Sequence, residues 1–217
     1  MLSAYAGVKL HHYTVDIDGF AEGLINNQYQ PSHILDHSSD REGNREARAA
    51  GFFYRGLSKT ELLQSREAIQ DYEEALLRVP DFFYSSFNMG VEYVRLEDFT
   101  NSLSAFRRSW NSILKAGRGE LDDSLLWNRK VFSRDRAYCF FYYGMAAVMC
   151  GQFNELEELI GNSRDFTFTQ PQVVEARTLF EKIIKGELTR EEGRLQVEAW
   201  TMSLNEKKSR KKLPRMG

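Results

Sequence analysis

Cysteine and proline are scarce in this sequence, and each scarcity narrows what the protein can be. Among 217 residues there are 2 Cys and 4 Pro. On one helix, at about 1.5 Å per residue, Cys139 and Cys150 would stand about 16 Å apart, which is too far for a disulfide. Their aromatic and apolar neighbours favour buried thiols in a reducing compartment. Because the chain has neither a signal-peptide pattern nor a run of about 20 apolar residues, we expect a cytoplasmic protein.

The sequence also lacks the common motifs of catalytic sites. His33 and His37 have the i,i+4 spacing that zinc ligands use on a helix, and Asp36 is nearby. Pro31 precedes this pair closely and no further ligand is identified, so surface or linker histidines are the simpler interpretation. The glycines at 117 and 119 lack the third glycine of a phosphate loop, and no Gly-x-Ser-x-Gly elbow occurs. We therefore expect that the protein is not an enzyme and that it binds no metal, cofactor or small-molecule substrate. An enzyme that uses the histidines remains a third hypothesis, after the two binding functions that are described below.

Charge is balanced over the whole chain but not at its end. The 29 basic and 31 acidic residues give a net charge of −2, which argues against a general nucleic-acid binder. Residues 205–217 form a basic tail. Its basic residues are Lys207, Lys208, Arg210, Lys211, Lys212 and Arg215. Association with nucleic acid or an anionic membrane through this tail is therefore the alternative function.

With little proline and 25 Phe and Tyr residues (15 Phe and 10 Tyr), the chain favours long helices that pack through large side chains. A pattern of large, small and aromatic residues runs along residues 49–82 and ends in a proline. Its positions are Phe52, Gly56, Ala68, Tyr72, Ala75 and Pro80. Four of these six recur in the same residue class at one fixed offset, as Gly90, Ser102, Phe106 and Ser109. The offset is the period of about 34 residues that is typical of repeated helix pairs, and it predicts an all-α protein.

These residues resemble the tetratricopeptide repeat family, with Phe-Phe-Tyr-Arg-Gly and Ala-Ile-Gln-Asp-Tyr-Glu-Glu-Ala-Leu-Leu-Arg-Val-Pro as the best-matching stretches. The resemblance implies antiparallel helix hairpins stacked as a short right-handed solenoid. Repeats are expected at about 49–82, 83–116 and 137–165, with an insertion at 117–136. Because of this insertion the third repeat begins later than the period predicts, and Gly144 corresponds to Gly90. It is degenerate, because Leu156 and Ile160 replace the small and the aromatic residue.

Other segments flank these repeats. Residues 1–44 match no repeat and are expected to form an N-terminal extension, with residues 38–44 as the linker to a repeat domain at 45–204. Pro171 at a helix start, and Thr189 with Glu192 as a capping box, predict C-terminal capping helices over residues 171–204. Such helices would cover the apolar face that a terminal repeat leaves exposed.

In the family that the chain resembles, the first helix of each repeat lines a concave ligand surface. The corresponding positions here are mostly aromatic and apolar. They are Phe53, Leu57, Tyr84, Phe87, Asn88, Val91, Tyr138, Phe141 and Met145. Only Asn88 fits the polar clamp by which some family members grip a peptide carboxylate, so that ligand class is excluded. The groove suits an apolar or amphipathic segment of a partner protein, as in an adaptor, assembly factor or chaperone.

The same pattern has a second interpretation, in which these aromatics are ordinary core. Helix amphipathicity alone does not distinguish a ligand groove from a face that the protein itself covers. The cover would be residues 1–44 or a second copy of the chain. A homodimer that forms through Trp110, Trp127 or Trp200 is a further alternative, and the sequence does not choose among the three.

Overall fold

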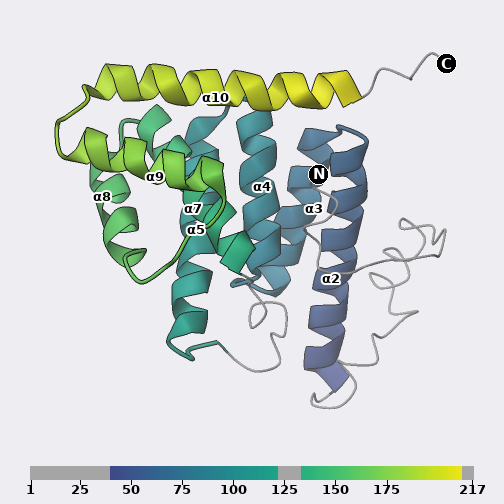
Figure 1. Ribbon diagram of the computed structural model, residues 1–217. Coiled ribbons are helices and arrows are strands. Elements are labelled where there is room, and N and C mark those ends of the chain that lie inside the picture. Colours follow the sequence, from purple (N-terminus) through teal and green to yellow (C-terminus); the bar gives the residue numbers. More distant parts are fainter. Residues whose placement is uncertain (1–39, 122–132, 212–217) are drawn as a thin grey trace. The chain divides into compact units, whose positions relative to one another are not determined.

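The computed structural model describes residues 40–121 and 133–211, with side chains over 45–121 and 134–202. These residues are helical and include no strand, so the expectation of an all-α protein is confirmed. The helices are α2 (Asp40–Glu61), α3 (Ser65–Arg78), α4 (Phe83–Arg95), α5 (Phe99–Gly117), α7 (Ser133–Met149), α8 (Phe153–Asn162), α9 (Pro171–Ile184) and α10 (Arg190–Lys211) (Figure 1). None of the described helices is both long enough and apolar enough to cross a lipid bilayer.

The chain divides into two compact units, Met1–Cys139 and Phe140–Gly217, with the division inside α7. In the first unit α2 packs against α3, α3 against α4, and α4 against α5. These four helices stand side by side, each antiparallel to the next (Figure 1). In the second unit α9 packs against both α8 and α10.

Two helix pairs of the first unit meet through the same contact. A Cβ atom added to Gly56 of α2 would lie 2.6 Å from Cε1 of Tyr72 on α3. At Gly90 of α4, the added Cβ would lie 2.7 Å from Cε1 of Phe106 on α5. Both rings are 0% exposed. Each ring therefore packs against the helix backbone at a position where a side chain larger than that of glycine would collide with it. The second contact follows the first by one full period of the sequence pattern.

The turns that follow α2, α4 and α7 also share one geometry. Leu63, Glu97 and Gly151 occupy them in the left-handed region, with φ of 59°, 59° and 66°. In each turn the next residue donates its backbone N–H to the carbonyl five positions earlier, the arrangement known as a Schellman motif. These bonds run from Gln64 to Lys59 (2.9 Å), from Asp98 to Tyr93 (2.9 Å) and from Gln152 to Ala147 (2.8 Å). The hairpin turn thus recurs with the same spacings as the three glycines at 56, 90 and 144.

The second unit departs from the expected packing of the third repeat. Gly144 of α7 again faces an aromatic ring, but the ring belongs to Phe180 of α9. Ile160, expected in that role, is half-exposed on α8, whereas Leu156 is fully buried. Because Leu156 is larger than the alanine or serine at its counterparts, the ring over Gly144 comes from a helix beyond the hairpin.

Several helix boundaries follow the residues that predicted them. Helix α3 ends at Arg78, two residues before Pro80, and α9 begins at Pro171. At the start of α10 the Thr189 N–H donates to Oε2 of Glu192 at 2.8 Å, and the Glu192 N–H donates to Oγ1 of Thr189 at 3.2 Å. The expected capping box is confirmed.

Two boundaries differ from the sequence-based expectation. Helix α2 begins at Asp40, inside the segment expected to be a linker. Acidic residues are favourable in the first turn of a helix, and Asp40 and Glu42 stand there. Helix α10 continues to Lys211, into the basic tail. The four histidines and most of the insertion lie outside the described residues.

We predict that Gly56→Ala and Gly90→Ala each lower the free energy of unfolding by about 1–3 kcal/mol, because the new methyl group overpacks against a buried ring. Gly161→Ala in α8 is the matched control, since nothing lies within 4 Å of its added Cβ. Alanine should stabilise that helix by about 0.5–1 kcal/mol. Urea denaturation measures all three, and a Gly90→Ala protein as stable as the wild type would contradict the packing.

Candidate protein-interaction surface

The residues expected to line one groove are divided between the two units. Those of the first unit are Phe53, Leu57, Tyr84, Phe87, Asn88, Val91 and Tyr138, whereas Phe141 and Met145 belong to the second. Their exposure differs as well, which separates residues that build the core from residues that can meet another molecule.

Phe53, Phe87 and Val91 belong to the core of the first unit. They are 2%, 3% and 3% exposed. The Phe53 ring centroid lies 5.0 Å from that of Phe82. The Phe87 ring is stacked on that of Phe83 at 5.8 Å. These rings have partners within the chain, which agrees with the interpretation that the aromatic residues are ordinary core.

Phe141 and Met145 are buried in a comparable way. The Phe141 ring centroid lies 5.8 Å from that of Trp200 on α10, and Met145 is 1% exposed. Trp110, another residue considered for a dimer contact, is 2% exposed. Trp127 lies outside the described residues. The described tryptophans therefore contribute to packing inside the chain.

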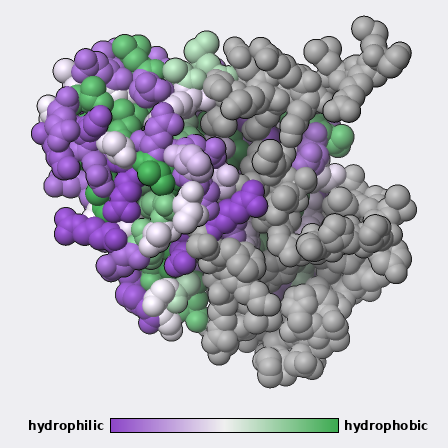
Figure 2. All heavy atoms as spheres, viewed as in Figure 1, coloured by the Kyte–Doolittle hydropathy of each residue, from purple (hydrophilic) through white to green (hydrophobic). Residues whose placement is uncertain are grey.

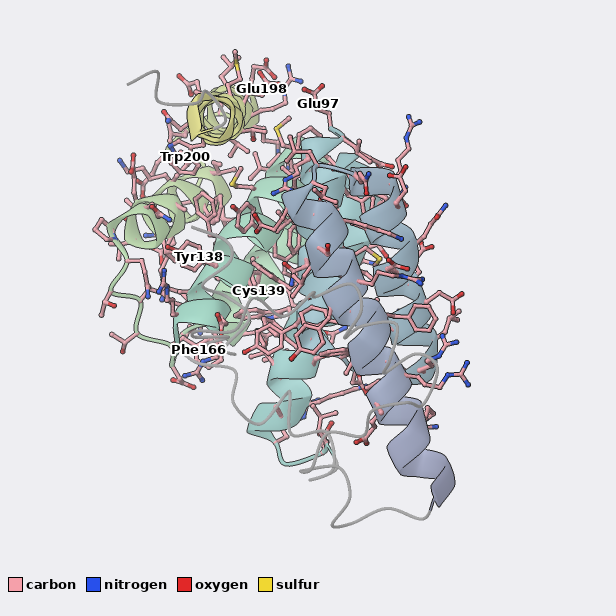
Figure 3. The ribbon with its side chains drawn as sticks, turned by 90° about the vertical axis from the view of Figure 1, so that its right-hand side faces the viewer. Glu97, Tyr138, Cys139, Phe166, Glu198 and Trp200 are labelled. Carbon is pink, nitrogen blue, oxygen red and sulfur yellow. The ribbon has the colours of Figure 1, made fainter. Side chains whose placement is uncertain are left out.

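Leu57, Tyr84 and Tyr138 remain half-exposed. Tyr84, in the first turn of α4, donates its hydroxyl proton to Oδ2 of Asp135 at 3.1 Å, which joins α4 to the start of α7 within the first unit. Burial and the neighbouring Asp135 carboxylate raise the pKa of Tyr84 above its usual value. Tyr138 follows Asp135 by three residues on α7 (Figure 3). Asn88 is nearly buried, and its Nδ2 donates to the Tyr84 carbonyl at 2.7 Å.

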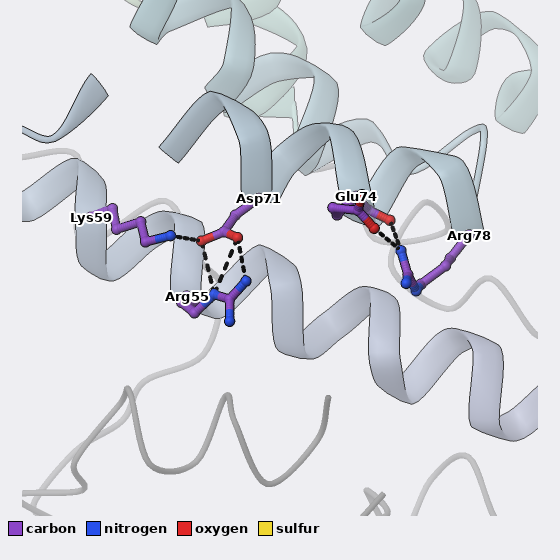
Figure 4. A network of polar contacts seen from close by, with 5 residues as sticks. All are labelled: Arg55, Lys59, Asp71, Glu74 and Arg78. Carbon is purple, nitrogen blue, oxygen red and sulfur yellow. Dashed lines mark hydrogen bonds and ion pairs between the residues drawn. The ribbon is translucent and has the colours of Figure 1, made fainter. Parts of the chain in front are cut away.

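Basic side chains on α2 are held by a buried carboxylate. Asp71 on α3 is 2% exposed, and its Oδ1 accepts a hydrogen bond from Nη2 of Arg55 at 2.7 Å. Its Oδ2 lies 2.7 Å from Nζ of Lys59 (Figure 4). On α3, Arg78 pairs with Glu74 at 2.6 Å, and its guanidinium lies 4.3 Å from the centre of the Phe52 ring. These ion pairs engage Arg55, Lys59 and Arg78 within the first hairpin, which agrees with the exclusion of a carboxylate clamp.

A buried polar cluster joins the last turns of α2 and α4. Glu92 is 0% exposed, and its Oε1 accepts a hydrogen bond from Thr60 at 3.1 Å and from Arg95 at 2.5 Å. Thr60 is also 2.9 Å from the Tyr72 hydroxyl. Sequence reasoning missed this cluster. The available signal was a glutamate between Val91 and Val94, on the apolar side of a helix.

No group of three or more His, Cys, Asp or Glu side chains that could hold a metal ion occurs in the part of the chain that the structure describes. Cys139 is fully buried, and burial raises the pKa of its thiol well above the usual value. Neither cysteine is part of a disulfide. Cys150 is half-exposed instead of buried, because α7 ends just before it.

The visible face over α8 and α9 is largely hydrophilic, with small hydrophobic areas between hydrophilic side chains (Figure 2).

Comparisons with protein-family models, with curated proteins and with solved structures found no match.

We predict that Tyr84→Phe lowers the free energy of unfolding by about 1.5–3 kcal/mol at neutral pH, because a hydrogen bond to a charged group is lost. The loss should shrink above about pH 10. There the unfolded tyrosine releases its proton, whereas the folded one keeps it, so the stability that Tyr84 contributes falls as the pH rises.

Denaturation of wild type and variant over a series of pH values measures this difference. A stability difference that is the same at about pH 8 and about pH 11 would contradict the raised pKa of Tyr84.

Proposed function

We propose that this protein is a helical-repeat module that binds an apolar or amphipathic segment of a partner protein, as an adaptor, assembly factor or chaperone does. Its hairpins are proposed to form a short right-handed solenoid like that of the tetratricopeptide repeat family. The single observation that carries the proposal is the recurrence, one period later in the chain, of both the ring-on-glycine contact and the hairpin turn.

Recurrence supports a binding role through a physical argument. Stacked hairpins bring equivalent positions of their first helices onto one elongated surface, where an extended segment or a helix can contact several repeats at once. Tyr84 and Tyr138 are equivalent positions, since each precedes its glycine, Gly90 or Gly144, by the same distance in the sequence, and both are half-exposed. In the first hairpin the equivalent position is the buried Ala50, and the half-exposed apolar residue is Leu57, seven residues further along α2. Leu57 and the two tyrosines are the proposed contacts.

The buried rings have a different role in this proposal. The Phe53 ring centroid lies 6.4 Å from that of Tyr84, and Phe87 is stacked on Phe83, so these rings support the helices of the surface without meeting the ligand. Each large apolar side chain that a ligand buries against the surface would contribute about 1.5–3 kcal/mol before entropic costs.

We predict that the double variant Leu57→Ser and Tyr138→Ser captures at least tenfold less partner than the wild type, roughly the effect of 1.4 kcal/mol. The tagged full chain is used to capture proteins from an extract of its source, and the captured proteins are quantified by mass spectrometry. Leu77→Ser is the matched control, because Leu77 is 75% exposed on α3, a second helix of a hairpin. The control should capture the same proteins as the wild type.

Equal capture by the double variant and the wild type would contradict the proposed surface. Replacing Phe87 or Phe141 is a poor test, because polar residues at these buried rings would destabilise the fold itself. Capture that requires residues 205–217 and falls steeply with salt would instead favour the alternative function, binding of nucleic acid or anionic membrane by the tail.

A further inference from the structure

Large apolar side chains are exposed where the first two hairpins turn. Leu62 is 61% exposed and Leu63 is 49% exposed in the turn after α2. Leu96, which is 41% exposed, stands at the position equivalent to Leu62 in the turn after α4, one period further along the chain. These three leucines therefore expose apolar side chains to water in two equivalent turns, and clustered apolar side chains on a surface often mark a site of interaction.

These two turns are neighbours in space. Oγ1 of Thr60 donates to Glu92 at 3.1 Å, and Nη1 of Arg95 donates to the Thr60 carbonyl at 3.3 Å. The bonds tie the last turn of α2 to the last turn of α4. Leu96 follows Arg95 directly and Leu62 follows Thr60 by two residues, so the exposed leucines stand at the ends of two helices that a buried polar cluster joins.

Leu63 adds an observation that packing does not explain. Its φ of 59° lies in the left-handed region, where a Cβ atom is unfavourable and glycine is the usual residue. Glu97 and Gly151 occupy the corresponding positions in the second and third turns, with φ of 59° and 66°, so Leu63 is the one apolar side chain among the three. A leucine that is both strained and half-exposed lowers stability and solubility together, and such outliers motivate a functional hypothesis.

The charge around the leucines has one predominant sign. Glu61, Glu67 and Glu97 are exposed at these turns, and Glu97 stands at the end of α4 (Figure 3). The basic residues Lys59 and Arg95 are held in ion pairs with Asp71 and Glu92. Arg66 is the exposed base of the α2–α3 turn. The leucines are therefore rimmed mainly by carboxylates.

We propose that this turn edge, made of Leu62, Leu63 and Leu96 with Glu61, Glu67 and Glu97, docks a basic segment of a partner protein that carries aliphatic side chains. The leucines receive the aliphatic side chains, and the carboxylates attract the flanking lysines or arginines. A second copy docked edge to edge would place carboxylates against carboxylates. Anionic lipid and nucleic acid would meet the same repulsion.

This surface is separate from the one proposed above. Leu57, Tyr84 and Tyr138 lie along first helices, whereas the turn edge lies where those helices end. The two surfaces can therefore be tested with different variants, and loss of one leaves the other intact.

The test uses the full chain and a fluorescent peptide of leucine and lysine at helical spacing, with a leucine–glutamate peptide as the matched control. We expect the lysine peptide to bind at least about tenfold more tightly than the glutamate peptide, and its affinity to fall with added salt. The variant Leu62→Ser with Leu96→Ser should weaken lysine-peptide binding about tenfold. Leu77→Ser, which removes a leucine of 75% exposure elsewhere on the first unit, should leave it unchanged.

Leu63→Gly separates a loss of binding from a loss of folding. Relief of the left-handed strain should raise Tm by about 2 °C, while removal of the side chain weakens lysine-peptide binding. Equal binding of the two peptides, equal binding by the Leu62→Ser and Leu96→Ser variant and the wild type, or preferential binding of anionic phosphatidylserine vesicles would each overturn the proposal.

Discussion

The close approach of two helices across a glycine is the contact on which the first unit depends. Tyr72 and Phe106 are fully buried, and each lies where a Cβ atom of Gly56 or Gly90 would be. Because the ring packs against the backbone of the first helix, it fixes the distance between the two helices and their relative position along the helix axis. In both hairpins the first helix ends in a Schellman turn, with Leu63 or Glu97 in the left-handed region. Repetition of this geometry gives the unit its regular form.

The second unit uses the same contact with a different connection. Gly144 is covered by Phe180 from α9, because the hairpin's own helix α8 has Leu156 and Ile160 where the repeat has a small and an aromatic residue. Phe180 also packs against Phe140, with ring centroids 5.9 Å apart. The glycine of α7 therefore has an aromatic cover although α8 lacks the small and aromatic residues of the first two hairpins.

Sequence reasoning predicted the helices and several of their ends because those features depend on local chemistry. Pro80, Pro171 and the Thr189–Glu192 box act over a few residues. It predicted the core less well. The periodicity of Phe53 and Phe87 identifies an apolar face, but only tertiary contacts show that Phe82 and Phe83 cover them. Glu92 was missed because its partners Thr60 and Arg95 come from two helices, and no local pattern unites them.

The ring-on-glycine packing can be observed most directly by NMR. Because an α-proton of Gly56 and of Gly90 lies close to an aromatic ring, its resonance should be displaced by the ring current relative to the α-protons of Gly161, whose surroundings are open. Nuclear Overhauser effects should also connect Gly56 with the Tyr72 ring and Gly90 with the Phe106 ring. Unshifted α-protons at both glycines, without these Overhauser effects, would contradict the hairpin geometry described for the first unit.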